Sequence, residues 1–213
     1  DKLGKKLKFR IATSTLRTIE KNGGIDSFLL NAVSENLSSN AKKYKKSILI
    51  TGSSSGIGLA VAKDLSKLGW NVIASCRKEE DCKILKDKYG LNSTVIDYGN
   101  QKTILSGLEY TLDKTNGKID VLFNNGAYGL PALVEDIPVD SLRDIFETNF
   151  FGWHSLTKEI IPHMKVNGSG RIIQNSSILG FMALKYRGAY TATKYAIEAM
   201  SDTLRLEIKN DNI

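Results

Sequence analysis

"SILITGSSSGIG" at residues 47–58 decides the fold, because a short apolar run leads directly into a turn that contains three glycines. The run predicts a strand, and the residues from Ile57 onward predict the helix after it. In such a turn Gly52 would permit the tight bend, Gly56 would let a pyrophosphate approach the backbone, and Gly58 would let helix and strand pack closely. The stretch therefore indicates a dinucleotide site, although glycines also serve ordinary turns and a structural loop is the alternative.

From residue 47 onward, short β-rich runs alternate with longer helical patterns. We expect strands at 47–52, 71–77, 93–98, 119–127 and 170–179. We expect helices at 57–70, 78–90, 101–117, from near 140 to 163, and at 190–208. The alternation predicts an α/β fold of the Rossmann type, a doubly wound parallel sheet with helices on both faces. In the first helix the apolar spacing predicts one buried face, made by Ile57, Ala60, Val61, Leu65 and Leu68.

The excess positive charge lies entirely in front of this domain. Residues 1–46 hold 11 Lys and Arg against 4 Asp and Glu, whereas the rest of the chain holds 19 of each. This asymmetry predicts two parts, a basic strand-plus-helix segment at 1–46 and a dinucleotide-binding domain at 47–213.

Composition also excludes several classes of protein. Cys76 and Cys82 fit neither a zinc site nor a disulfide framework, and we expect Cys76 to be buried and unreactive. His154 and His163 have no third ligand at metal-site spacing, so no metal is expected. Two cysteines without a disulfide framework favour a reducing cytoplasm. The apolar runs are too short to cross a bilayer, so no membrane contact is expected.

The end of the second expected strand bears on the choice of cofactor. An acidic residue there would bind a ribose 2′-hydroxyl, whereas an arginine favours a 2′-phosphate. The strand ends in Arg77, which favours NADP and leaves NAD possible. The alternative is that Arg77 is a solvated surface charge.

Tyr190 and Lys194 are candidates for proton transfer. They are four residues apart and would share a helix face, where an ammonium favours the phenolate of a neighbouring tyrosine. A surface pair of no function is the alternative.

Ser177, 13 residues before Tyr190, would lie at the carboxyl end of the fifth strand and hold a substrate oxygen. The alternative is that Ser176 or Ser177 merely ends the strand.

Two further polar sites follow from position. Asn124, Asn125 and Gly126 would occupy the same sheet edge after the fourth strand. Asn149 lies inside the long helix, where asparagine is mildly unfavourable, and would bend the helix or hold a water.

The motifs "TGSSSGIG", "VIDYGN", "NNGAYG", "ETNFFG", "QNSSILG" and "YTATK" occur in this order over residues 47–213, which resemble the short-chain dehydrogenase/reductase family. The resemblance implies hydride transfer between a nicotinamide cofactor and an alcohol or carbonyl. It makes Tyr190 the general acid/base, and Lys194 a ligand of the nicotinamide ribose that favours the phenolate. Ser177 would orient the substrate oxygen, and Asn149 would hold a proton-relay water.

The same resemblance implies which residues bind the cofactor. Asp97 and Tyr98 would border the adenine ring, and Asn124 would contact the cofactor ribose. The remaining expected cofactor residues are Gly52, Ser54, Ser55, Gly56, Ile57, Gly58, Arg77, Gly126, Tyr190 and Lys194.

The resemblance also has departures and further implications. Members of the family continue past this last helix, so we hypothesise a truncated chain with an exposed fifth strand and weak or no activity. The full-length form is expected to be a homo-oligomer. Apolar residues at 127–136 and 180–186 would flank the site and favour an apolar small-molecule substrate, although core packing explains them equally well.

The leading segment carries a second resemblance. "KFRI", "LRTIEKNGGIDSFLL" and "NAKKYKK" are similar to the carboxyl-terminal half of the bacterial ribosomal protein L-twenty-eight family, which implies contact with rRNA phosphates. The alternative function is therefore an rRNA-binding structural component, joined to the reductase part by a merged reading frame. A basic extension that packs on the reductase is a further alternative.

Overall fold

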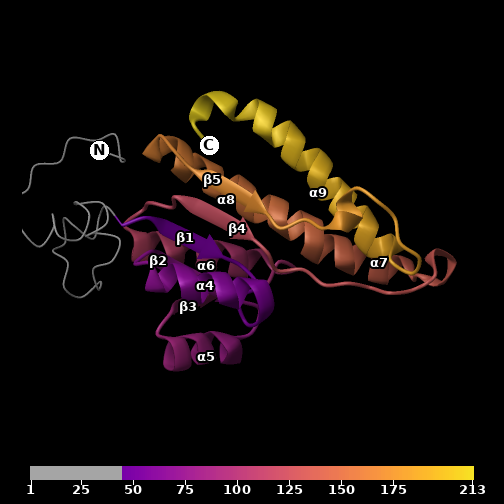
Figure 1. The fold of residues 1–213 in the computed structure, drawn as a ribbon, viewed down its shortest axis with the longest axis horizontal. Coiled ribbons are helices and arrows are strands. Elements are labelled where there is room, and N and C mark those ends of the chain that lie inside the picture. Colours follow the sequence, from indigo (N-terminus) through magenta and orange to yellow (C-terminus); the bar gives the residue numbers. More distant parts are fainter. Residues whose placement is uncertain (1–44) are drawn as a thin grey trace, which may run out of the picture.

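The computed structural model describes residues 45–213 and has a parallel sheet at its centre (Figure 1). Five strands run in the order β3-β2-β1-β4-β5, with Leu49 of β1 beside Ile73 of β2 and Leu122 of β4. The strands are β1 (Ser47–Ile50), β2 (Asn71–Cys76), β3 (Asn92–Val95), β4 (Val121–Asn124) and β5 (Arg171–Gln174). This arrangement confirms the predicted Rossmann-type α/β fold.

Helices cover both faces of the sheet (Figure 1). They are α4 (Gly56–Lys67), α5 (Glu79–Tyr89), α6 (Gln101–Thr115), α7 (Val139–Phe146), α8 (Gly152–Asn167) and α9 (Gly188–Glu207). Ile48, Ile50 and Val72 point toward α4 and α5, where they pack with Ala62 and Leu85. The alternate positions, such as Leu49 and Leu122, pack on the opposite face with residues of α6, α8 and α9. The central strands β1, β2 and β4 are therefore buried on both sides, as their continuous apolar sequences predict, whereas β3 and β5 at the sides of the sheet are partly exposed.

The buried face of α4 differs from the prediction. Ile57 and Leu68 are 59% and 55% exposed, and Ala60 is also exposed, whereas Gly58 and Ala62 are the buried residues of this helix. Leu59, which the predicted face leaves out, is partly buried and packs against the core. Val61 and Leu65 were placed correctly, since both pack against the core.

The long helix is interrupted by one wide turn. α7 runs into a π-helical turn at Glu147–Phe151, and α8 continues directly from it. Asn149 lies in this turn and is fully buried. The predicted bend at Asn149 therefore coincides with a real change of helix geometry, of the kind that often marks functional sites.

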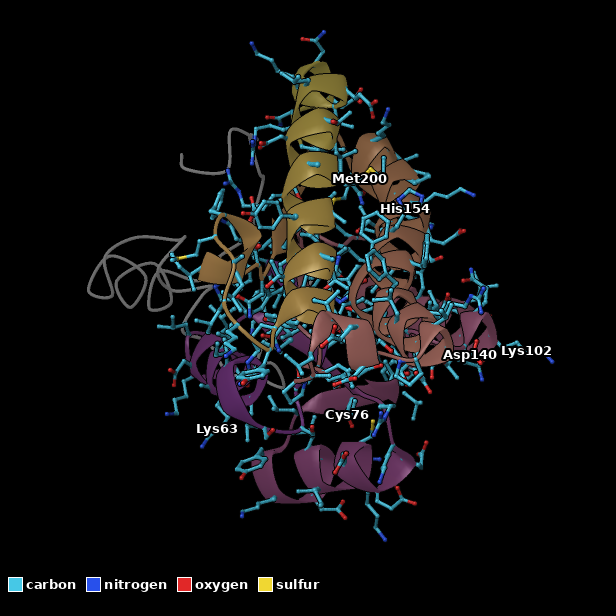
Figure 2. All side chains as sticks on the ribbon, turned by 90° about the vertical axis from the view of Figure 1, so that its right-hand side faces the viewer. Lys63, Cys76, Lys102, Asp140, His154 and Met200 are labelled. Carbon is cyan, nitrogen blue, oxygen red and sulfur yellow. The ribbon has the colours of Figure 1, made fainter. Side chains whose placement is uncertain are left out.

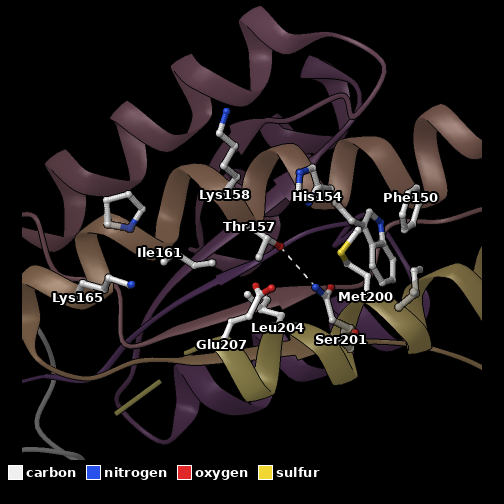
Figure 3. Close-up of a pocket in the computed structure, with 14 residues that line it drawn as sticks. Phe150, His154, Thr157, Lys158, Ile161, Lys165, Met200, Ser201, Leu204 and Glu207 are labelled. Carbon is white, nitrogen blue, oxygen red and sulfur yellow. Dashed lines mark hydrogen bonds between the residues drawn. The ribbon is translucent and has the colours of Figure 1, made fainter. Parts of the chain in front are cut away.

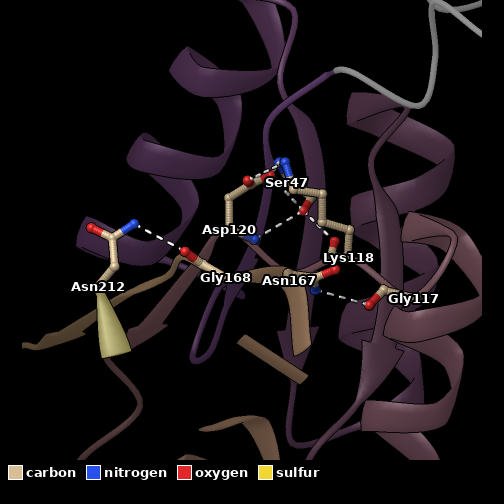
Figure 4. A network of polar contacts seen from close by, with 7 residues as sticks. All are labelled: Ser47, Gly117, Lys118, Asp120, Asn167, Gly168 and Asn212. Carbon is tan, nitrogen blue, oxygen red and sulfur yellow. Dashed lines mark hydrogen bonds and ion pairs between the residues drawn. The ribbon is translucent and has the colours of Figure 1, made fainter. Parts of the chain in front are cut away.

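The two edges of the sheet differ. We call the edge where the strands begin the amino edge and the edge where they end the carboxyl edge. At the amino edge the Ser47 amide donates to Asp120 Oδ2 at 2.7 Å, and Lys118 Nζ lies 2.6 Å from Asp120 Oδ1 (Figure 4). Nearby, Asn212 Nδ2 donates to the Gly168 carbonyl at 3.0 Å. These groups satisfy one another and leave the carboxyl edge as the place for a ligand site.

β5 lies at one side of the sheet and pairs with β4 alone among the described strands. Ile173 is 41% exposed there, in agreement with the expected exposed fifth strand. No helix within residues 45–213 is long and apolar enough to span a bilayer. The predictions of a ribosomal-protein-like segment, its strand-plus-helix organisation and its rRNA contact concern residues 1–46, nearly all of which lie outside the described residues.

Candidate active site

Two adjoining cavities open at the carboxyl edge of the sheet. The larger has a volume of about 650 Å³ and the smaller about 270 Å³, and Ala127 and Tyr128 line both. The larger cavity is also lined by Gly56, Ile57, Asn125, Gly129, Asn175, Ser176, Leu179, Arg187, Tyr190 and Lys194. The smaller is also lined by Gly52, Ser54, Arg77, Lys78, Asp81, Ile96, Asp97, Tyr98, Gly126 and Thr148.

The glycine turn has the backbone shape that its sequence predicts. Gly52 and Gly56 have φ values of +61° and +57°, a region that side chains other than glycine rarely adopt. A Cβ atom on Gly58 would lie 2.4 Å from the Gly52 carbonyl oxygen, so only glycine fits this close approach. A Cβ on Gly56 would meet nothing within 4 Å, because the space above it belongs to the larger cavity. The turn thus offers open room for an anionic group beside backbone N–H donors at the start of α4.

Asn125 connects this turn to β4 and β5. Its Nδ2 donates to the carbonyl oxygens of Thr51 and Gly52, both at 3.1 Å, and its Oδ1 accepts from Asn175 Nδ2 at 2.8 Å. The backbone amide of Asn125 also donates to Thr51 Oγ1 at 2.9 Å. Asn125 therefore fixes the shape of the glycine turn, whereas its place in the sequence predicts only that it lies at this edge of the sheet.

The side chain of Asn124 points the other way. It is fully buried, with Nδ2 donating to Thr157 Oγ1 at 3.0 Å and to Gln174 Oε1 at 2.9 Å. Its Oδ1 lies 2.8 Å from the hydroxyl of Tyr98, a residue whose pKa is raised by burial. Asn124 thus uses its polar atoms inside the core between β4, β5 and α8, and it lines neither cavity.

α9 presents Tyr190 and Lys194 to the larger cavity. Lys194 is 1% exposed, and its Nζ donates to the Asn175 carbonyl at 2.8 Å. The same Nζ lies 4.4 Å from the ring centroid of Trp153 and 5.4 Å from that of Tyr190. Burial lowers the pKa of Lys194 to about 8, an effect that the nearby carboxylate of Glu198 opposes. At neutral pH the ammonium is therefore still the main form, held against two aromatic rings.

Ser177 lies beside the larger cavity without lining it. Its Oγ accepts a hydrogen bond from the Leu179 amide at 3.2 Å, which leaves its hydroxyl proton free to be donated. Its neighbour Ser176 lines the cavity, and Ser176 Oγ is buried with no hydrogen-bond partner among the described residues.

Asn149 holds the loop whose residue Tyr128 lines both cavities. Its Oδ1 accepts from the Tyr128 amide at 3.0 Å, and its Nδ2 donates to the Tyr128 carbonyl at 2.8 Å. A weaker contact joins Asn149 Nδ2 to Thr193 Oγ1 at 3.3 Å. The side chain is therefore placed by α7 and α8 to anchor Tyr128 against α9.

The structure brings most of the predicted residues to these cavities. Gly56, Ile57, Tyr190 and Lys194 line the larger one, and Gly52, Ser54, Arg77, Asp97, Tyr98 and Gly126 line the smaller. Ser55, Gly58, Asn124, Asn149 and Ser177 line neither. Asn125, Asn175, Ser176 and Arg187 line the larger cavity and were not predicted as site residues. Only the first three adjoin a predicted residue or lie in a quoted motif, so the sequence carried a weak signal for them and none for Arg187.

A separate, mainly apolar cavity of about 370 Å³ lies between α8 and α9, where His154 and Met200 face each other (Figures 2 and 3). None of the predicted site residues lines it. Within residues 45–213 no group of His, Cys, Asp and Glu has the arrangement of a metal site. Cys76, at the end of β2 (Figure 2), is buried and free, and a hydrogen bond with Cys82 together with burial raises its pKa.

Comparison with known proteins gives a consistent result. The profile of the family described as short chain dehydrogenase matches residues 46–213. An uncharacterized oxidoreductase, YbbO, of Escherichia coli is 37% identical over 172 residues, which are 81% of this chain and 64% of the relative. The chain thus spans less than two thirds of this relative's length.

Two solved structures have the same fold. A 3-ketoacyl-(acyl-carrier-protein) reductase of Brucella melitensis, complexed with NADH, superimposes with a TM-score of 0.75 at 26% identity, covering 79% of this chain and 71% of that one. An actinorhodin polyketide ketoreductase with NADPH has a TM-score of 0.73 at 27% identity, over 78% and 66% of the two chains.

Proposed function

The chain belongs to the short-chain dehydrogenase family, and from this membership we propose that it transfers a hydride between a nicotinamide cofactor and an alcohol or carbonyl compound. One observation carries the proposal. A single cavity of about 650 Å³ brings the open glycine turn at Gly56 together with Tyr190 and Lys194. The related structures that hold NADH and NADPH support a nicotinamide cofactor as the partner of this cavity.

The residues present fit such a cofactor. The open space above Gly56 leaves room for a diphosphate beside the start of α4, since a Cβ there would meet nothing within 4 Å. Arg77 and Lys78 line the smaller cavity and would accommodate a 2′-phosphate, so we favour NADP over NAD. When bound, the nicotinamide supplies or accepts the hydride.

The remaining chemistry is proton transfer by the chain's own side chains. Tyr190 would donate the proton to a carbonyl oxygen, or remove it from an alcohol. Lys194, held as an ammonium by the Asn175 carbonyl, would favour the phenolate of Tyr190 electrostatically and would bind the nicotinamide ribose. Ser177 would orient the substrate oxygen with its free hydroxyl proton. Asn149 would serve this arrangement by holding Tyr128, and would hold a relay water only if a water replaces one of its present partners.

We further propose an apolar small-molecule substrate. The loop between β5 and α9 exposes Ile178, Phe181, Met182 and Leu184 by 68%, 70%, 52% and 59%. This loop also supplies Leu179 and Arg187 to the larger cavity, so an apolar molecule that enters it would cover part of that surface. A homo-oligomer through α8 and α9 remains a proposal of the same kind.

A fluorescence titration with NADPH and NADH tests the cofactor, and the variant Tyr190→Phe tests the chemistry. We expect NADPH to bind about tenfold more tightly than NADH, and Arg77→Gln to remove that preference. Tyr190→Phe should lower turnover by about 10²- to 10⁴-fold, far more than it weakens the binding of NADPH. Equal turnover by Tyr190→Phe and the parent chain would exclude the proposed acid/base role.

A further inference from the structure

Arg187 stands out in the larger cavity because nothing in the described part of the chain uses its charge. Its guanidinium makes no hydrogen bond and no ion pair with any residue in 45–213, although the residue is partly buried. Among the residues that line this cavity, Arg187 and Lys194 are the charged ones, and none is acidic. Lys194 already donates to the Asn175 carbonyl and lies against Trp153, so its charge is committed. Arg187 is therefore the cation left available to a ligand.

The backbone around Arg187 is firmly held. Its amide donates to the Leu184 carbonyl at 3.1 Å, and its carbonyl accepts from the Thr191 amide at 2.8 Å. The preceding carbonyl, that of Tyr186, accepts from the Ala132 amide at 3.2 Å, and Ala132 and Arg187 form a parallel bridge. Arg187 thus sits where two loops meet, one from β4 and one from β5.

This position is held at a conformational cost. Tyr186 has φ +65°, a left-handed conformation that is rare for a bulky residue other than glycine. Strain of this kind persists where the surroundings fix it, and it concentrates at ligand sites. In this chain the strained residue directly precedes Arg187, and its carbonyl is the one held by the Ala132 amide.

Arg187 also lies close to the proposed proton donor. It is the residue before α9, with no capping hydrogen bond from its own side chain, and Tyr190 follows three positions later on the same face. Its Nη1 lies 3.6 Å from the point where a Cβ on Gly129 would be. The guanidinium therefore lies against Gly129, and the diphosphate is proposed for the open space above Gly56. The amino end of α9, a helix of 20 residues, adds a favourable field for negative charge.

From these observations we propose that Arg187 binds an anionic group of the substrate, a carboxylate or a phosphate. The proposal rests on the proposed function and narrows it. The substrate is a carbonyl or alcohol that carries one negative group near the reacting carbon, and an apolar remainder lies on the exposed loop. A guanidinium suits this task because its fixed fork of donors matches carboxylate and phosphate oxygens in a bidentate way.

Matched pairs of probes test the proposal. Pyruvate, acetoacetate and levulinate are each compared with their methyl ester, and dihydroxyacetone phosphate with dihydroxyacetone, as substrates with NADPH. We expect at least one anionic probe to exceed its neutral partner in kcat/KM by about tenfold or more. Arg187→Met should lower that ratio by about 10- to 100-fold, and Arg187→Lys should lower it less, since lysine keeps the charge and loses the fork. Lys185→Met, a change at an exposed neighbour, should leave the ratio unaltered.

Three possible outcomes distinguish the role of Arg187 from the proposed function. If the chain turns over neutral probes with no preference for anionic ones, the role of Arg187 is wrong and the proposed function stands. If no probe is turned over, the proposed function is in doubt. Calorimetry then compares the affinities of the anionic and the neutral probe of each pair for the NADPH complex. Equal affinities overturn the role of Arg187. If Arg187→Met weakens NADPH itself tenfold and leaves the probe ratio intact, the guanidinium serves the cofactor diphosphate and the proposal fails. Far-ultraviolet circular dichroism checks that each variant is folded.

Discussion

At the amino edge of the sheet Ser47, Lys118 and Asp120 bond to one another, whereas at the carboxyl edge Arg77 and Arg187 have no ion-pair partner within residues 45–213. The first set stabilises the fold, since each of its polar groups is hydrogen-bonded or ion-paired with another group of the chain. The second set forms no ion pair beside the two cavities, although Asp81 and Asp97 line the smaller cavity together with Arg77. Polar side chains of similar type are thus bonded within the chain at one edge and remain able to bind a ligand at the other. Donors without a partner in the chain identify the functional edge better than residue type does.

The largest expected effect of a substitution at the carboxyl edge is at the glycine turn. We expect Gly58→Ala to weaken NADPH binding by more than about 100-fold and to destabilise the fold by about 1–3 kcal/mol, because the new Cβ would lie 2.4 Å from the Gly52 carbonyl oxygen. Gly56→Ala is the matched control: its methyl meets open space, so it should cost only the ~1–2 kcal/mol of a left-handed alanine.

Urea unfolding and NADPH titration of both variants check this prediction. Gly56→Ala should still lose cofactor affinity, since its methyl group enters the space proposed for the diphosphate. A Gly58→Ala protein with normal stability and normal affinity would mean that the turn relaxes without cost, against the close packing described.

Lys194 provides the second test, through the pH dependence of stability. Burial lowers its pKa from 10.5 to about 8 in the folded protein, so the unfolded chain holds this proton more firmly. Between these values the unfolded state binds more protons, and the unfolding free energy rises with pH. We expect a rise of about 3 kcal/mol from this group, complete near pH 10.5 and absent below pH 8.

Lys194→Met removes this contribution and is the reference for it. Urea unfolding of both proteins across that pH range should show a parent curve that climbs relative to the variant. Parallel curves would mean that Lys194 titrates normally, and that the Trp153 ring and the Asn175 carbonyl fully offset its loss of solvent.

The third and smallest effect concerns the amino edge. Asp120→Ala should lower the unfolding free energy by about 1–3 kcal/mol, because it leaves the Ser47 amide and the Lys118 ammonium without their partner. The Asp120 side chain is only 15% exposed, whereas Asp64, in its pair with Lys67, is 72% exposed. Asp64→Asn is therefore the control and should change stability by less than about 0.5 kcal/mol.

Chemical denaturation measures both variants, and NADPH titration should give them the affinity of the parent chain. A loss of cofactor affinity in Asp120→Ala would show that the two edges are coupled, and that the division between a closed edge and an available edge is too simple.

The order of strands and helices could be predicted because apolar runs and helical periodicity alternate along the chain. The exposure of the side chains on α4 could not be predicted in the same way. The pattern placed Ile57 and Leu68 on the buried face, but both are exposed. The buried residues of α4 are Gly58 and Ala62, with Leu59, Val61 and Leu65 partly buried against the core. Apolar spacing follows large side chains, so it misses a buried glycine.

The sequence predicts which residue types make up the site, but it predicts less well which way their side chains point. All four residues of β4 are buried, so no alternation tells which face each side chain takes, and the structure turns Asn124 into the core and Asn125 toward the turn. The same ambiguity separates Ser176 from Ser177 after β5. Arg187 could not be found at all, since its position depends on a loop path that includes the strained Tyr186.

The wide turn at Glu147–Phe151 has a consequence for how this protein tolerates change. A π turn carries one residue more than an α turn, and each residue rotates a helix by about 100°. Deleting one residue there would restore a regular helix, yet it would swing every later position of α8 away from its neighbours, starting with Trp153. Exchanges of the exposed side chains Glu147 and Phe151, unlike those of the buried Asn149, are therefore the milder class of mutation. A change in its length would disturb the whole of α8 at once.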